Sequence, residues 1–221
     1  MANEVEVIVL GAALGFVAWT LTRMAARDPE TGEDDTSADL EDLGYQVIDY
    51  GTEYIDQIDD MSADQNLTAF LNAIRFGEGT SGADGYNILC GGGRFDSYGK
   101  HPALAGWGGW RMPLAMAAAA GFPNGAVSTA AGAFQINRPT YNRLSSKLGL
   151  SDFSPSTQRA MAIELIREKG ALADAMAGRA LVAAQKVRKV WASLPGAGYG
   201  QHEVASTTFL NKYINAGGTV A

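Results

Sequence analysis

Apolar residues recur at helical spacing through most of the chain after residue 65. The first stripe consists of Leu67, Phe70, Leu71 and Ile74. Its i, i+3, i+4 and i+7 spacing predicts an amphipathic helix with one face in a core. Asp64 or Asn66 can cap the start of this helix, and Gly79 can end it in a left-handed conformation. The same pattern predicts further helices at 135–148, 155–168, 170–177, 179–193 and 202–216.

Two stretches interrupt this helical pattern. In residues 86–98, two short runs flank Gly91-Gly92-Gly93, which predicts a small β-hairpin about a glycine turn. Residues 106–125 are rich in Gly, Ala and Trp, which predicts a long mobile loop with a short helix from Pro113 to Ala120. The C-terminal part of the chain is therefore predicted to be a mostly helical α+β domain.

An uncharged and mostly apolar run of sixteen residues, Val7 to Thr22, lies near the start of the chain. It is at or just below the length of about 17 to 25 residues that spans a bilayer. Trp19 and Arg23 suit the membrane interface. A cleaved signal peptide is disfavoured because two glutamates precede the run, and a buried helix is disfavoured because the next segment is too polar to cover it. We therefore predict an N-terminal transmembrane helix.

The segment after this run is strongly acidic. Residues 28–64 hold fourteen Asp or Glu and no Lys or Arg. Residues 28–39 are polar and rich in turn formers, as in a linker or disordered segment. Residues 40–61 carry apolar residues at spacings of three and four, which predicts an amphipathic helix interrupted by Gly44 and Gly51. This helix can pack on the domain, on a membrane surface or on a second copy, so residues 40–61 and the anchor helix are the candidate homo-oligomer contacts.

The net charge of −7 hides an asymmetry, because residues 65–221 hold fifteen basic and eight acidic residues. A basic domain suits an anionic polymer. We predict no nucleic-acid partner, because the aromatic residues do not interleave with the basic ones as a stacking platform requires. A single Cys, Cys90, excludes an intramolecular disulfide, and with only two His it disfavours a structural zinc site. No phosphate-binding glycine loop is present, and we predict neither a metal nor a cofactor.

Glu78 is the candidate catalytic residue. It follows Phe76 at the predicted C-terminal end of the first helix, just before Gly79. The negative end of the helix dipole and burial against apolar groups both disfavour an ionised carboxylate. A glutamic acid that stays protonated near neutral pH can donate its proton to a substrate. The local pattern is also that of a solvated Glu before a helix-ending Gly, and taken alone it favours this simpler interpretation.

Longer runs of sequence favour the catalytic interpretation of Glu78 over the simpler one. They are Glu78-Gly79-Thr80, residues 86–92, Phe95, Tyr98, His101-Pro102, and residues 128–135, 148–155, 169–172 and 191–201. In these runs, from about residue 66 to 220, the chain resembles the endolysin family of phage lambda, lytic transglycosylases with a lysozyme-like fold. Agreement in order over some 150 residues is far more specific than a motif. The resemblance makes Glu78 the expected catalytic acid.

The resemblance implies a peptidoglycan substrate, cleaved at the β-1,4 bond between N-acetylmuramic acid and N-acetylglucosamine. In a transglycosylase the muramic C6 hydroxyl attacks C1 and closes a 1,6-anhydro ring, so one carboxyl group serves first as acid and then as base. A hydrolytic muramidase would use a second carboxylate, for which Asp96 is the candidate. Asp84 lies in a turn where Asp is expected for backbone reasons. A third alternative is a non-catalytic virion membrane protein that only binds peptidoglycan, but such a protein has no need of Glu78.

The resemblance also implies two sugar-binding segments. Residues 128–135 form a small-residue turn that offers Ser128, Thr129, Phe134 and Gln135. The glycine-rich loop at 196–201 offers Tyr199 for stacking and Gln201 for hydrogen bonds. Trp191 is predicted to lie in the core. The loop at 103–125 is longer than the family's and the loop at 79–85 is shorter; Trp107 and Trp110 in the former are expected at a groove lip or a membrane.

The first 65 residues lie outside the resemblance. They predict a tethered enzyme in the virion membrane or the host inner membrane, whose catalytic domain acts on periplasmic peptidoglycan. The predicted organisation is an N-terminal transmembrane anchor at 1–27, an acidic linker with an amphipathic helix at 28–65, and a lysozyme-like catalytic domain at 66–221.

Overall fold

The computed structural model describes residues 62–119, 121–198 and 203–221. They belong to the second of two compact units, Tyr54–Ala221. The predicted anchor and linker lie outside the described residues, apart from the last four linker positions, so the predicted domain boundaries stay predictions. The elements in chain order are a helix at 62–77, the 3-10 helices Gly85–Asn87 and Pro102–Leu104, β1 (Trp110–Arg111), α3 (Leu114–Ala119), β2 (Val127–Ser128), α4 (Arg138–Leu148), α5 (Pro155–Glu168), α6 (Leu172–Met176), α7 (Ala180–Val187) and α8 (Ser206–Asn215).

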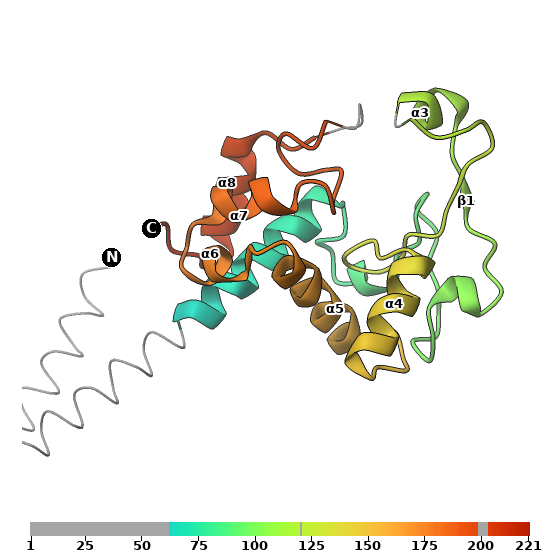
Figure 1. Cartoon of the computed structure of the whole chain (residues 1–221), viewed down its shortest axis with the longest axis horizontal. Helices are drawn as coiled ribbons and strands as arrows, with labels where there is room; N and C mark the ends of the chain where they lie inside the picture. Colours follow the sequence, from blue (N-terminus) through green and yellow to red (C-terminus); the bar gives the residue numbers. More distant parts are fainter. Residues whose placement is uncertain (1–61, 120, 199–202) are drawn as a thin grey trace, which may run out of the picture. The chain divides into compact units, whose positions relative to one another are not determined.

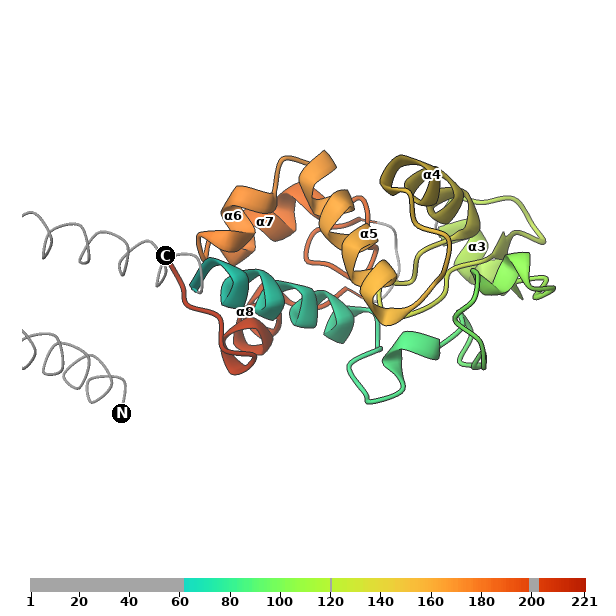
Figure 2. The same ribbon diagram turned by 90° about the horizontal axis from the view of Figure 1, so that it is seen from below.

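The helix at 62–77 is central to the helical part. Its predicted apolar stripe is buried, and Phe70 packs edge-on against Phe209 of α8 with ring centroids 5.8 Å apart. Figures 1 and 2 both show α5, α6, α7 and α8 gathered around this helix. The apolar stripe therefore does what its periodicity predicts, which is to face a core built by later helices.

Asn66 joins this helix to the end of the chain. Its Oδ1 accepts hydrogen bonds from the Tyr213 hydroxyl and the Thr219 N–H, both at 2.8 Å, and its Nδ2 donates to the Met176 carbonyl at 3.0 Å. The predicted capping role is wrong, because the helix already includes residue 62. Asn66 is instead a buried connector whose partners lie more than a hundred residues away.

Two helices, α4 and α5, begin at polar caps. Asn137 Oδ1 accepts the Thr140 N–H at 3.0 Å, so α4 begins after Asn137 and not at the predicted residue 135. Ser154 Oγ accepts the Thr157 N–H at 3.3 Å, and α5 has the predicted bounds. The helix predicted at 179–193 is too long, because α7 ends at Val187 and the chain then turns to bury Trp191. Shorter helices, α6 and α8, lie within the segments predicted at 170–177 and 202–216.

The hairpin predicted at 86–98 is reduced to one antiparallel bridge between Ile88 and Arg94. Residues on its first arm turn their remaining backbone groups to another segment: the Cys90 N–H donates to the Ala130 carbonyl at 2.9 Å, and the Gly132 N–H donates to the Ile88 carbonyl at 2.8 Å. The first arm therefore pairs with residues 130–132, which are distant in sequence, and this pairing takes the place of the predicted strands.

The two-stranded sheet lies instead in the region predicted to be a loop. β1 and β2 pair antiparallel, with Trp110 opposite Ser128 and Arg111 opposite Val127. The predicted short helix is present as α3 between the two strands. Figure 1 shows α3 at the end of an extension formed by residues 110–128, away from the other helices. Gly109 permits the pairing, because a Cβ there would lie 2.4 Å from Val127 Cγ1. The α+β class is confirmed, but its strands come from residues 110–111 and 127–128.

No helix in the described part of the chain combines the length and the apolar character needed to cross a bilayer. The apolar run at 7–22 lies outside that part, so the transmembrane helix stays a prediction.

The Asn66 connector gives a test of stability. Asn66→Ala should lower the free energy of unfolding by about 3 kcal/mol, because it removes several buried hydrogen bonds and leaves the Thr219 N–H without its acceptor. In a domain of this size that corresponds to a fall of about 6–12 °C in melting temperature. Gln65→Ala is the matched control, since exposed Gln65 makes a single hydrogen bond to the Gly217 carbonyl, and it should cost less than about 1 kcal/mol. Equal losses in both variants would contradict the assignment.

Candidate active site

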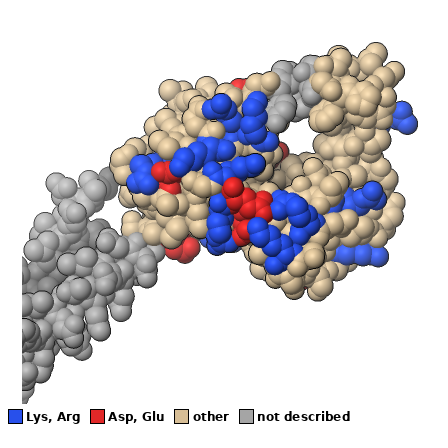
Figure 3. Space-filling view, in the orientation of Figure 1, with Lys and Arg blue, Asp and Glu red and all other residues tan. Residues whose placement is uncertain are grey.

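Glu78 follows the last turn of the helix at 62–77. The Gly79 φ of 70° and the hydrogen bond from the Thr80 N–H to the Arg75 carbonyl, 2.8 Å long, close the helix as predicted. The helix in Figure 1 runs toward the hollow that Figure 3 shows between the helices and the extension carrying α3. Glu78 is thus carried by a rigid element whose end geometry is fixed by glycine.

The Glu78 carboxyl group is largely removed from water and faces one donor side chain. The Ser193 hydroxyl donates to Glu78 Oε1 at 2.5 Å. Burial raises the pKa of Glu78 above its usual 4.5, while hydrogen bonds from the side chain and backbone of Ser193 act in the opposite direction and are the weaker influence. Gly77 makes this approach possible, since a Cβ there would lie 2.7 Å from Ser193 Oγ. Burial therefore favours the protonated form of this carboxyl group, which is the form that a general acid needs.

Ser193 is held by the segment that follows α7. Trp191 is buried, as predicted, and its Nε1–H donates to the Phe134 carbonyl at 2.9 Å. The Ser193 carbonyl accepts the Val204 N–H at 2.8 Å. Ser193 lies in the sequence run at 191–201, but its own role could not be predicted, because a hydroxyl gains this role only from the side chain that it meets in the fold.

The predicted sugar-binding turn is fastened next to Glu78. Thr80 lies two residues after Glu78, and its hydroxyl donates to the Ala133 carbonyl at 2.6 Å. Gln158 of α5 is fully buried; its Oε1 accepts the Ala133 N–H at 2.8 Å, and its Nε2 donates to the Tyr86 and Phe153 carbonyls. A Cβ on Gly132 would lie 2.1 Å from Gln158 Oε1. Gln158 was missed in the sequence, although a buried amide on the apolar face of 155–168 is the signal that could have found it.

The four residues predicted on this turn have different surroundings. Ser128 Oγ accepts the Ala130 N–H at 3.3 Å, and Thr129 Oγ1 accepts the Arg138 N–H at 3.0 Å. Phe134 is only 1% exposed, with its ring edge-on to Tyr86, so here it serves core packing and a substrate contact stays a prediction for it. Gln135 is the one described non-glycine residue with positive φ, 45°, and its Nε2 donates to the Gly132 carbonyl at 3.0 Å. Such backbone strain persists where the surroundings fix it, often at a functional site.

Tyr199 and Gln201 lie outside the described residues. The chain on either side of them is anchored by Glu203, whose carboxylate accepts the Gly196 N–H at 2.9 Å and the Gly198 N–H at 2.5 Å. Their predicted contacts with sugar stay predictions.

The two other candidate carboxylates lie in more open surroundings. Asp84 forms an ion pair with Arg94 at 2.5 Å, and both side chains are more than half exposed. Asp96 is exposed. Trp107 and Trp110, predicted at a groove lip or membrane, are both half-buried, with Trp110 in β1. Within the described ranges, no three His, Cys, Asp or Glu side chains come together in a group that could hold a metal ion.

A mostly helical domain with a small two-stranded sheet and one sheltered glutamic acid at a helix end defines the chain as lysozyme-like. The family model for endolysins matches residues 68–220, and the chain belongs to the endolysin family. It is 35% identical over 158 residues to the endolysin of Escherichia phage lambda, covering 69% of this chain and 91% of that one. It is 37% identical over 167 residues to the endolysin of Escherichia phage P2, covering 71% of this chain and 96% of that one.

Solved structures give the same class. Bacteriophage lambda lysozyme in complex with a chitohexasaccharide is 33% identical and superposes with a TM-score of 0.60, covering 71% of this chain and 97% of that one. A second structure of lysozyme from bacteriophage lambda, 34% identical, superposes with a TM-score of 0.58 over the same shares of the two chains. The lysozyme-like fold expected from the resemblance is therefore confirmed.

The raised pKa of Glu78 predicts how stability depends on pH. The folded protein holds this proton more tightly than the unfolded chain, so the stabilising contribution is complete below the unfolded pKa and is lost as pH rises through the folded pKa. Glu78→Gln carries no charge at any pH. It should therefore melt at a higher temperature than the wild type at about pH 7, and the difference should shrink toward about pH 4. Asp96→Asn, at an exposed position, is the control for the change in net charge. A Glu78→Gln protein that is less stable than the wild type at neutral pH would contradict the burial argument.

Proposed function

We propose that the chain is a phage peptidoglycan lytic transglycosylase. It cleaves the β-1,4 bond between N-acetylmuramic acid and N-acetylglucosamine and leaves a 1,6-anhydro-muramic end. The proposal rests on Glu78, a carboxyl group whose pKa is raised by burial and which faces a single hydroxyl donor. Membership in the endolysin family, and the chitohexasaccharide bound by the similar lambda lysozyme, support a glycan of this type as the substrate.

The geometry supports an acid that later acts as a base. Protonated Glu78 donates its proton to the glycosidic oxygen as the bond to C1 breaks and positive charge develops there. The muramic C6 hydroxyl then attacks C1, and the Glu78 carboxylate takes the hydroxyl proton. Between the two transfers Glu78 is an anion, and the hydrogen bond from Ser193 stabilises that state. Burial and Ser193 therefore favour opposite protonation states, and a group that must both give and take a proton needs both.

The surroundings of the other carboxylates favour a mechanism with one acid. Asp84 forms an ion pair with Arg94 at a solvent-exposed site. Asp96 is exposed, and no hydrogen bond or ion pair joins its carboxylate to another described side chain. The muramic hydroxyl removes the need for a second carboxylate, since it replaces both the enzymatic nucleophile and the attacking water of a hydrolase.

The product distinguishes this mechanism from the hydrolytic one. Digestion of peptidoglycan sacculi should release muropeptides that end in 1,6-anhydro-muramic acid, each lighter by one water than a hydrolase product, and mass spectrometry can measure this difference. Glu78→Gln should lower turnover by more than about a hundredfold, since general acid–base catalysis typically contributes that much. Asp96→Asn should keep most of the activity and the same product. Reducing muramic ends, together with an Asp96→Asn protein as inactive as Glu78→Gln, would establish the two-carboxylate muramidase instead.

We further propose that residues 1–27 tether the enzyme to the virion membrane or the host inner membrane, where the catalytic domain acts on periplasmic peptidoglycan. The run at 7–22 supports this proposal because it is uncharged and mostly apolar, and because Trp19 within it and Arg23 after it suit the membrane interface. The acidic segment after it supplies a polar connection to the basic domain.

The tether predicts different partitioning for the full chain and for its second compact unit. The full chain should require detergent and sediment with membranes, whereas residues 54–221 should remain in the supernatant and retain activity on isolated sacculi. Flotation with lipid vesicles, followed by immunoblotting of each fraction, measures this. A full chain that stays soluble without detergent and does not float with vesicles would refute the tether.

A further inference from the structure

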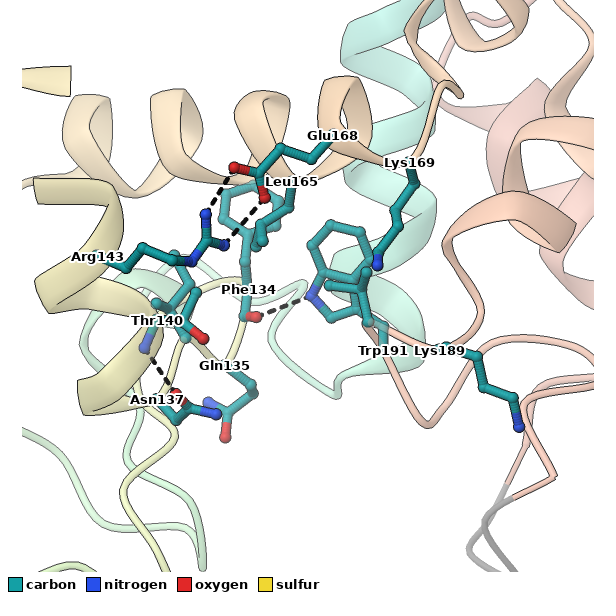
Figure 4. A pocket seen from close by; sticks show the side chains of 12 residues that line it. Phe134, Gln135, Asn137, Thr140, Arg143, Leu165, Glu168, Lys169, Lys189 and Trp191 are labelled. Carbon is teal, nitrogen blue, oxygen red and sulfur yellow. Dashed lines mark hydrogen bonds and ion pairs between the residues drawn. The ribbon is translucent and has the colours of Figure 1, made fainter. Parts of the chain in front are cut away.

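A pocket of about 280 Å³ lies where α4, α5 and the segment after α7 meet. Figure 4 shows Arg143 from α4 and Glu168 from α5 on one side, with Gln135 and Trp191 on the others. It is distinct from the immediate surroundings of Glu78, which is not among the residues lining it.

The pocket nevertheless adjoins the proposed catalytic site through the chain. Trp191 lines the pocket, and Ser193, two residues further on, binds Glu78. Two residues span at most about 7 Å. Gln135, one of the predicted sugar-binding residues, lines the pocket as well. A substituent on a sugar held at the catalytic site therefore has this pocket within reach.

The pocket carries an excess of positive charge. Its lining includes the cationic residues Arg143, Lys169 and Lys189 and one acid, Glu168. Glu168 is already neutralised, because Arg143 donates to both of its carboxylate oxygens, at 2.6 and 3.0 Å, and Lys147 donates at 2.8 Å. These contacts lower the pKa of Glu168 to about 2. Glu168 therefore acts as the counterion of Arg143 and Lys147 on α4, and it does not balance the charge of Lys169.

Lys169 takes no part in the ion pairs with Glu168. Its ammonium group makes no hydrogen bond or ion pair with another side chain in the described ranges, and Figure 4 shows it beside Trp191. Lys189 differs, since its Nζ donates to the Ala197 carbonyl at 2.5 Å and so holds the loop that follows. On the opposite wall, Asn137 Oδ1 accepts the Thr140 N–H, which leaves the Asn137 NH2 group as a donor.

We propose that this pocket binds a carboxylate of the peptide that peptidoglycan carries on its muramic acid, with Lys169 as the main charged contact. The inference rests on the proposed function, because only a peptidoglycan substrate brings such a peptide to this site. An ammonium group and amide N–H donors match a carboxylate, and their charge-assisted hydrogen bonds are the strong ones. The sugars themselves are neutral apart from the lactyl group, whose carboxylate is consumed by the link to the peptide. The pocket thus makes the enzyme prefer glycan strands that carry peptides.

The test compares full-chain wild type and Lys169→Gln on two substrates, peptide-bearing glycan strands and the same strands after amidase has removed the peptides. Lys169→Gln should raise KM on peptide-bearing strands by about tenfold with little change in kcat, and should leave the KM on stripped strands unchanged. Lys100→Gln is the matched control, an exposed lysine outside the pocket, and should change neither value. Melting temperatures of the three proteins should agree.

Binding measurements on a variant without the catalytic acid test this inference independently of the proposed function. Calorimetry of full-chain Glu78→Gln, with and without Lys169→Gln, uses a disaccharide-peptide, the disaccharide with a free lactyl carboxylate, and a chitooligosaccharide as ligands. Affinity lost only for the disaccharide-peptide supports the assignment, even if no anhydro product forms. Affinity lost for the lactyl disaccharide as well would assign the pocket to that carboxylate and overturn the peptide proposal. Equal losses for all three ligands, or no loss, would also overturn it.

Discussion

The site depends on a carboxyl group that is withdrawn from water at the end of a helix and faced by one hydroxyl. Burial raises the pKa of Glu78, and the 2.5 Å hydrogen bond from Ser193 limits how far that rise goes. Two partners more than a hundred residues apart can meet only because Gly77 leaves space for Ser193. A larger residue at 77 would displace the hydroxyl and leave the carboxyl group without the contact that stabilises its anion.

The segments around this contact are held by hydrogen bonds to backbone groups. Thr80 binds the Ala133 carbonyl, Trp191 binds the Phe134 carbonyl, and Gln158 binds three backbone groups from three different segments. The turn at 131–136 is therefore fixed from the Glu78 side, from the Ser193 side and from α5. This fixation explains how Gln135 can keep a positive φ, which no other described non-glycine residue adopts. The proposed catalytic acid, its hydroxyl partner and the predicted sugar-binding turn are one connected structure.

The structure shows where the basic residues of the C-terminal domain lie. On the face shown in Figure 3, Lys and Arg cover more of the surface than Asp and Glu do. Arg143, Lys169 and Lys189 line the pocket beside Trp191. Ion pairs account for some of this charge, as with Arg143 and Lys147 on Glu168, but not for Lys169. The composition shows the excess of positive charge only as an average over the domain, whereas the structure places part of it at the proposed peptide pocket.

The sequence by itself determined the helical core, the residue at the end of the first helix and the α+β class. Those features depend on local rules, namely the period of Leu67, Phe70 and Ile74, the cap at Ser154 and the left-handed Gly79. Tertiary structure decided the rest. Residues 88–90 keep hairpin hydrogen bonds at Leu89, but the Ile88 carbonyl and the Cys90 N–H bond to residues 130–132. The strands form instead at 110–111 and 127–128. The length of α7, the partner of Glu78 and the role of Gln158 likewise depend on groups distant in sequence, because burial and hydrogen bonding are set by what packs against a residue and the local period carries no information about that partner.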